Sequence, residues 1–161
     1  MPEMPLNSSS REMAGALPAT SLSAGAELFV WSVREWLAAA RERRCVKRNL
    51  IPRYHAVECV DAILPLDEMM CLLAVSALRP IQIRHCGCSA LSDDEMRLVQ
   101  CLRAVQRGDD ELAGQHLASL LPGPFSRTFL RPARQYASAI CSADLRFTGA
   151  RHLMVVEGAD R

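Results

Sequence analysis

Apolar residues that recur at three- and four-residue intervals constrain the fold more than any other feature of the sequence. From Ala24 to about Arg44 they lie on one face, while charged residues fall off it. An α-helix has about 3.6 residues per turn, so this spacing predicts an amphipathic helix with one buried side. The face consists of Leu28, Phe29, Val33, Trp36, Leu37 and Ala40.

Capping signals predict where two later helices begin and end. Ser92 is followed three residues later by Glu95, the pattern of a capping box, in which each side chain binds a free backbone N–H group. This pattern predicts a helix from Asp93 to about Gln106. Gly108 is expected to end that helix, and Asp109 is expected to cap the next one.

Prolines predict further helix boundaries. We expect Pro52 in the first turn of a second helix, since its missing N–H would have no partner there, and we expect that helix to stop at Pro65. The segment 67–78 is apolar on nearly every side and is predicted to be the most buried helix. The LPGP sequence at 121–124 should break the chain before a final helix that begins near Pro132.

These elements predict an all-α protein, an irregular or orthogonal bundle of five to six helices with a short extended segment near 80–90. Residues 1–23, rich in Ser, Pro and Ala, are expected to form a disordered N-terminal tail, because they bury too little apolar surface to offset their conformational entropy. Residues 24–150 then form a single helical domain, and residues 151–161 form a C-terminal tail.

Composition limits the compartment and the class of partner. The longest apolar runs fall far short of the ~20 residues that a membrane-spanning helix needs, so no membrane association is expected. The N-terminus lacks the pattern of a secretory signal, and seven cysteines are an odd number for a disulfide framework. We therefore expect a cytoplasmic protein with reduced thiols. A net charge of +1 gives no overall attraction to nucleic acid.

The sequence RHCGCSALSDDE, residues 84–95, concentrates the reactive side chains. A metal site could use Cys86 and Cys88 together with His55 and Cys59, whose i, i+4 spacing would place them on one helix face. Zn²⁺ is the ion that such sulfur and imidazole ligands favour. The alternative is that Cys59, like other cysteines on apolar helix faces, is a small buried hydrophobic residue.

A thiol switch is a second interpretation of the same segment. Basic neighbours and the following helix N-terminus would favour the thiolate forms of Cys86 and Cys88, whereas the three acids at 93–95 oppose them. These acids fit the helix dipole and the capping box better than acid–base catalysis. We expect Cys86 and Cys88 to be accessible loop thiols and Cys71 and Cys101 to be buried.

A run of cations lies at the end of the first predicted helix and in the loop after it, opposed in the sequence only by Glu42. Part of it is explained by the favourable interaction of cations with a helix C-terminus. The remainder could bind phosphates or an acidic protein surface, although no aromatic residues that would stack on bases are interleaved with it. The cations are Arg41, Arg43, Arg44, Lys47, Arg48 and Arg53.

No phosphate-binding loop, dinucleotide fingerprint, zincin motif or nucleophile elbow occurs in the sequence, so no catalytic residue is assigned. The sequence favours a small regulatory or adaptor protein that acts through contacts with a protein partner. The alternatives are a cysteine and histidine metal or redox sensor, a nucleic-acid-binding regulator that uses residues 41–53, and an enzyme with an unfamiliar site.

Overall fold

Six α-helices and one 3₁₀ turn, with no β-strand, make up residues 22–147, the part of the chain that the computed structural model describes. The predicted all-α bundle is confirmed. The predicted tails lie outside the described residues, apart from Leu22 and Ser23. The elements are α1 (Ala24–Arg41), α2 (Val46–Ala56), η2 (Val60–Ala62), α3 (Ile63–Ser76), α4 (Asp93–Gln106), α5 (Asp110–Leu117) and α6 (Gly123–Ser142).

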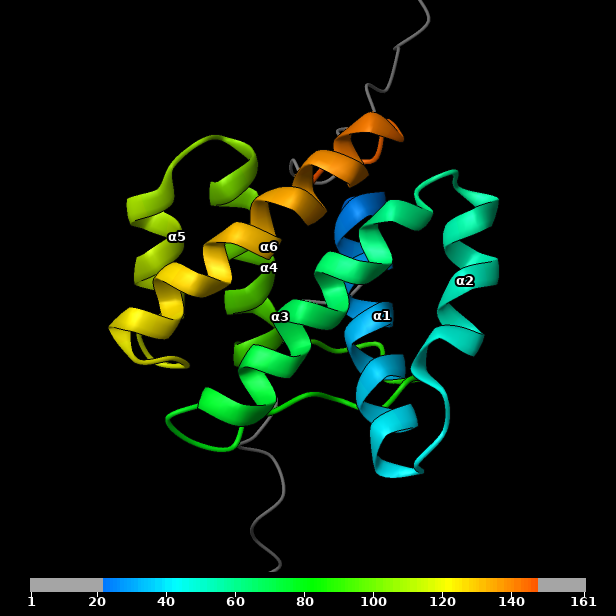
Figure 1. Cartoon of the computed structure of the whole chain (residues 1–161), viewed down its shortest axis with the longest axis horizontal. Helices are drawn as coiled ribbons and strands as arrows, with labels where there is room; N and C mark the ends of the chain where they lie inside the picture. The colour runs from blue at the N-terminus through cyan, green and yellow to red at the C-terminus, as the bar shows by residue number, and fades with distance from the viewer. Residues whose placement is uncertain (1–21, 148–161) are drawn as a thin grey trace, which may run out of the picture.

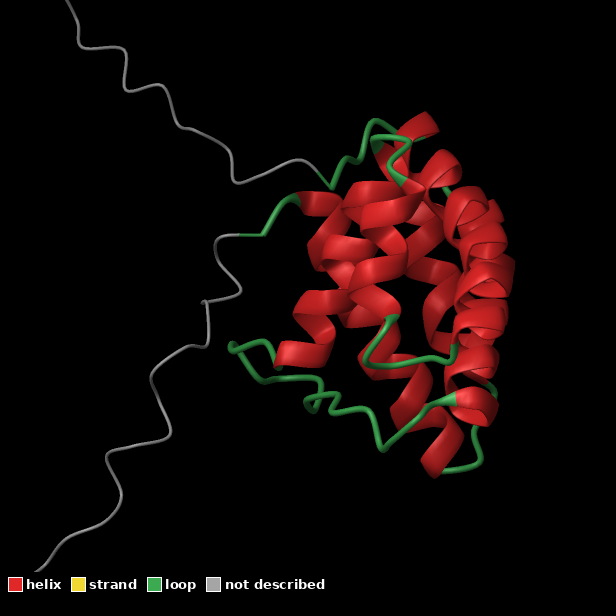
Figure 2. Ribbon diagram, turned by 90° about the vertical axis from the view of Figure 1, so that its left-hand side faces the viewer, coloured by secondary structure: helices red, strands yellow, loops and turns green. Residues whose placement is uncertain are grey.

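The helices form two layers (Figure 1). Helices α3 and α6 lie side by side and antiparallel in the front layer, with α1 and α4 behind them. Helices α2 and α5 flank the bundle at opposite ends. The long connection from α3 to α4, residues 77–92, carries no helix and crosses to the back of the molecule (Figure 2).

Three aromatic rings form the centre of the core between the two layers. Phe29 of α1 packs edge-on against Tyr136 of α6 and Phe147, with ring centroids 5.5 and 6.1 Å apart. Such edge-to-face pairs add to the free energy gained by burying the rings. Close approach is needed at the start of α1, where a Cβ on Gly25 would lie only 2.8 Å from the carbonyl oxygen of Arg146.

A chain of buried hydroxyl groups joins three helices. The Tyr54 hydroxyl of α2 lies 2.8 Å from Ser32 Oγ of α1 and 2.8 Å from the Tyr136 hydroxyl of α6. Ser32 in turn donates to the Leu28 carbonyl at 2.7 Å. Burial raises the pKa of Tyr54 to about 12 and the pKa of Tyr136 well above its ordinary value, so both hydroxyls keep their protons.

The local capping signals predicted both boundaries of α4 and the start of α5 correctly. Helix α4 covers Asp93–Gln106, and both hydrogen bonds of the Ser92–Glu95 capping box are present. Gly108, with φ of 79°, follows the end of α4, and Asp109 accepts a hydrogen bond from the Leu112 amide.

The boundaries predicted from proline were wrong at three positions. Pro52 and Pro132 lie inside α2 and α6, and Pro65 lies in the first turn of α3 instead of ending the helix before it. A proline in the first turn loses no hydrogen bond, which explains Pro65. At Pro52 and Pro132 the buried faces continue on both sides of the ring, so tertiary packing holds the helix through the missing bond.

The prediction that residues 67–78 are the most buried helix was also wrong. Met69, Met70 and Leu73 are buried, but Cys71 and Val75 are exposed. Helix α3 covers one side of the core from the front layer, so only one of its faces meets the rest of the bundle. Apolar composition alone could not distinguish this position from a central one.

The hydroxyl chain predicts an order of stabilities. Replacing Tyr54→Phe leaves the buried Tyr136 hydroxyl without its partner, which should lower the free energy of unfolding by about 1–3 kcal/mol. Replacing Tyr136→Phe leaves Tyr54 bonded to Ser32, so we expect the smaller loss of a single hydrogen bond, about 0.5–1.5 kcal/mol. Urea denaturation measures both values, and the reverse order would contradict the proposed geometry.

Candidate functional site

The segment that carries the reactive residues is an irregular loop, residues 81–92, which we call the HCGC loop. Polar groups of a loop need hydrogen-bond partners wherever water is excluded. Here two carboxylates in the first turn of α4 supply them. Asp94 and Glu95 are only 2% and 1% exposed, respectively.

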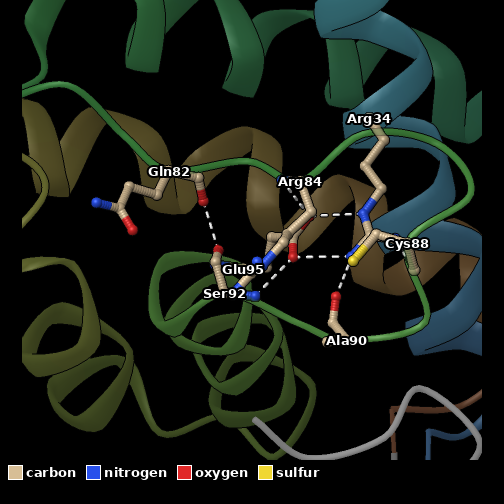
Figure 3. A network of polar contacts seen from close by, with 7 residues as sticks. All are labelled: Arg34, Gln82, Arg84, Cys88, Ala90, Ser92 and Glu95. Carbon is tan, nitrogen blue, oxygen red and sulfur yellow. Dashed lines mark hydrogen bonds and ion pairs between the residues drawn. The ribbon is translucent and has the colours of Figure 1, made fainter. Parts of the chain in front are cut away.

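Arg34 of α1 joins the HCGC loop to α4 (Figure 3). Its Nε donates to Glu95 Oε1 at 2.7 Å and its Nη2 donates to Glu95 Oε2 at 2.9 Å. The same guanidinium donates to the backbone carbonyls of Cys88 at 2.6 Å and Ala90 at 2.9 Å. One side chain therefore fixes a helix and two points of the loop, and its hydrogen bonds to Glu95 raise the pKa of Arg34.

Glu95 accepts further hydrogen bonds from the loop backbone. The amide of Arg84 donates to Oε1 at 3.1 Å and the amide of Ser92 donates to Oε2 at 2.8 Å. The Ser92 hydroxyl donates to the Gln82 carbonyl. With both oxygens bonded twice, the buried carboxylate has the partners that its loss of hydration requires.

Asp94 holds the beginning of the connection in the same way. Arg79 binds both of its oxygens at 2.7 Å, the Gln82 amide donates at 2.9 Å and Arg97 donates at 2.9 Å. These bonds, those from Arg79 first, lower the pKa of Asp94 to about 2. Asp94 and Glu95 thus bind the residues of the connection as well as stabilising the N-terminus of α4. The capping pattern in the sequence did not predict these bonds to the connection.

The thiol of Cys86 is half-buried beside the Glu35 carboxylate of α1. Burial and Glu35 raise the pKa of Cys86 to about 11, although Arg34 acts in the opposite direction. The expectation of an activated thiolate is therefore wrong for Cys86. Cys86 and Cys88 are both half-buried, not freely accessible.

The structure does not bring the four predicted zinc ligands together. Within residues 22–147 no three His, Cys, Asp or Glu side chains lie close enough to hold a metal ion. Helix α2 ends at Ala56, so His55 and Cys59 do not share a helix face. The Cys59 amide binds the Tyr54 carbonyl at 2.9 Å, and its side chain is buried in the core while His55 is exposed.

The other two cysteine predictions had different outcomes. Cys101 is fully buried, as expected, and burial raises its pKa to about 12. Cys71 was predicted to be buried but is exposed, because it lies on the outer face of α3.

The predicted cations at 41–53 lie on the surface formed by the end of α1, the following turn and α2. All six are exposed. Arg44 forms an ion pair with Glu42, and the guanidinium of Arg53 lies over the Trp31 ring, 4.2 Å from its centroid. With Arg84 and His85 of the HCGC loop, both exposed, these residues form what we call the basic surface.

A hollow of about 330 Å³ separates the end of α1 from the HCGC loop. We call it the basic cleft. Arg41, Arg44, Arg84 and His85 line it together with the carboxylates of Glu35 and Glu42. Sequence reasoning treated the reactive segment and the cations as separate features, because the contact between them depends on how the loop folds back over α1.

A second hollow, of about 360 Å³, lies on the other side of Cys86, which lines both. Its walls are more apolar and include Leu22, Val30 and Trp31, with Arg53 beside them. The loop thus separates a charged hollow from a more apolar one.

Comparisons with known proteins add no family to this description. The sequence matches no protein-family model, and neither a curated protein nor a solved structure matches it at a significant level. Among the helices of residues 22–147, none has the length and apolar character that crossing a bilayer requires.

The buried ion pair predicts a large effect of a small substitution. Replacing Glu95→Gln leaves the buried Arg34 charge uncompensated, which should cost about 3–5 kcal/mol of unfolding free energy. Replacing Arg97→Ala removes a half-exposed partner of Asp94 and should cost no more than about 1 kcal/mol. Similar midpoints of urea denaturation for the two variants would contradict a large contribution of the Arg34–Glu95 ion pair to the free energy of unfolding.

The Cys86 environment predicts a change in thiol chemistry. Because the Glu35 carboxylate raises the Cys86 pKa, Glu35→Gln should lower that pKa and speed alkylation of Cys86 below pH 11. Iodoacetamide labelling as a function of pH, resolved by peptide mass spectrometry, measures the effect. Buried Cys101 in the same sample is the internal control, and an unchanged Cys86 profile would show that Glu35 does not act on the thiol.

Proposed function

We propose that this protein is a regulatory or adaptor module that binds an acidic segment of a partner protein at the basic cleft. One observation carries the proposal. The end of α1 and the HCGC loop, which are far apart in the sequence, bring Arg41, Arg44, Arg84 and His85 around a single hollow.

The positive charge of the basic surface supports the proposal that its ligand is acidic. Most cations of the basic surface have no ion-pair partner within residues 22–147; Arg44, which pairs with Glu42, is the exception. Arg41, Arg44 and Arg84 outnumber the two carboxylates that line the hollow. An excess of one sign attracts oppositely charged groups and speeds their association.

The rigid backbone around the cleft supports binding as well. Arg34 and Glu95 hold the HCGC loop against α1 through hydrogen bonds to both side chain and backbone. A site that is ordered before binding loses less conformational entropy when the ligand arrives.

A protein segment fits this surface better than a nucleic acid. Trp31 borders the basic surface, but Arg53 lies over its ring, which leaves that face unable to stack on a base. The more apolar hollow beyond Cys86 matches the apolar side chains of an amphipathic acidic segment.

The sensor alternatives have less support. A protonated Cys86 is a poor nucleophile, and the four candidate zinc ligands lie apart. All seven cysteines are free, which suits the reducing cytoplasm that we propose as the compartment.

Fluorescence anisotropy with a labelled peptide rich in Glu, Asp and Leu tests the proposal on the full chain. We expect binding that weakens as salt is added, and at least about 10-fold weaker binding for the double variant Arg41→Glu and Arg84→Glu. Reversal of two exposed cations elsewhere, Arg107→Glu and Arg146→Glu, should change the affinity much less.

Two outcomes would overturn the proposal. Equal loss of binding in both double variants would mean that the peptide responds to net charge and not to the cleft. Tighter binding of a single-stranded DNA with the same number of charges would favour the nucleic-acid alternative.

A further inference from the structure

The outer face of α3 and the segment that follows it carry exposed apolar side chains. Leu64, Val75 and Leu78 are 59%, 80% and 57% exposed, respectively. Within α3, the exposed residues Leu64, Glu68, Cys71 and Val75 recur at intervals of three and four residues. This interval is the repeat by which two helices pack along a common seam. Asp61 of η2 precedes the helix and Leu78 follows it, and both are exposed.

The exposed side chains of α3 can pack against the same side chains of a second, antiparallel α3. If a second α3 lies antiparallel, with the two-fold axis between Glu68 and Cys71, Leu64 faces Val75 of the second copy. The same operation places Val75 opposite Leu64 of the second copy, as an isologous interface requires. Leu64 and Val75 are thus covered in symmetric pairs, while Leu78 lies toward Asp61 of the second copy.

A hollow lies beside each end of these exposed side chains. Leu64 borders a hollow of about 550 Å³ between the start of α3 and the second half of α6. Leu78 borders another, of about 530 Å³, near the start of α6.

Charges along this face complement one another in the same arrangement. Asp61 precedes α3 and Glu68 lies in its first half, whereas Arg127 and Arg131 are exposed on the first half of α6, which runs beside the end of α3 (Figure 1). Glu111 also borders this second end, and the Arg134–Asp110 ion pair connects the two hollows. Antiparallel stacking therefore sets Asp61 and Glu68 of one copy over the end of the second copy that carries Arg127 and Arg131.

We infer that the α3 and α6 face binds a second copy of this chain, with the two α3 helices antiparallel across the two-fold axis. Burial of the exposed leucine and valine side chains drives the association. The charges at the ends of the face fix the direction, since parallel stacking would set acid over acid.

Sedimentation velocity on the full chain at about 100 μM tests for the dimer. Val75→Asp places a charge in the seam and should weaken dimerisation at least about 10-fold. Ile51→Asp, at an exposed apolar residue of α2 outside the face, should leave it unchanged. Circular dichroism checks that both variants fold.

Charge exchange and crosslinking make the test specific. Glu68→Arg and Arg131→Glu should each weaken the dimer, and the two together should restore it. A short bismaleimide should link two copies through Cys71, which lies next to the axis, so Cys71→Ser should abolish the linked dimer while Cys45→Ser retains it.

Three outcomes would overturn the inference. The chain could sediment as a monomer at every concentration, the dimer could survive Val75→Asp, or crosslinking could persist in Cys71→Ser. The last two would locate self-association on another surface.

Discussion

The buried ion pair between Arg34 and Glu95 is the interaction on which the non-helical part of the structure depends. Two charges removed from water destabilise a fold unless their hydrogen bonds are replaced. Here the replacement comes from the HCGC loop itself, through the Cys88 and Ala90 carbonyls and the Arg84 and Ser92 amides. The loop backbone supplies hydrogen bonds to the charged groups of Arg34 and Glu95. The same bonds hold the loop in a single conformation.

This arrangement explains how an all-helical protein holds a long connection without a β-sheet. The backbone of residues 77–92 has few hydrogen bonds to other backbone groups, so side chains take their place. Because Arg34 lies on α1, the loop is fixed against that helix and not against α4 alone. The basic cleft exists for this reason, since one of its walls is the loop and the other is α1.

Sequence reasoning succeeded where a few neighbouring residues decide the structure. The Ser92–Glu95 capping box gave α4 its correct start, because both bonding partners lie within one turn. The same reasoning could not find that Glu95 binds Arg34, since 61 residues separate them. It also placed a helix start at Pro52, where burial of Leu50 and Tyr54 outweighs one missing hydrogen bond.

The candidate site shows the same division between local and long-range information. The six cations at 41–53 were identified because they lie within 13 residues of one another in the chain. Their exposure follows from their charge. The contribution of Arg84 and His85 to the same cleft depends on the path of the loop, and no local pattern encodes that path. The four candidate zinc ligands lie apart for a related reason: the chain turns after α2 at Glu58, which has a positive φ, and Cys59 is buried in the core.

Pro52 has a consequence for motion within the folded state. Helix α2 lacks the hydrogen bond that Pro52 cannot donate, and it buries only Leu50 and Tyr54. Elements with few buried contacts open at free energies well below that of global unfolding. The amide protons of α2 should therefore exchange with solvent earlier than those of α4 or α6. Each opening would briefly separate Lys47 and Arg48 from the rest of the basic surface, so a bound ligand that contacts them would slow that exchange.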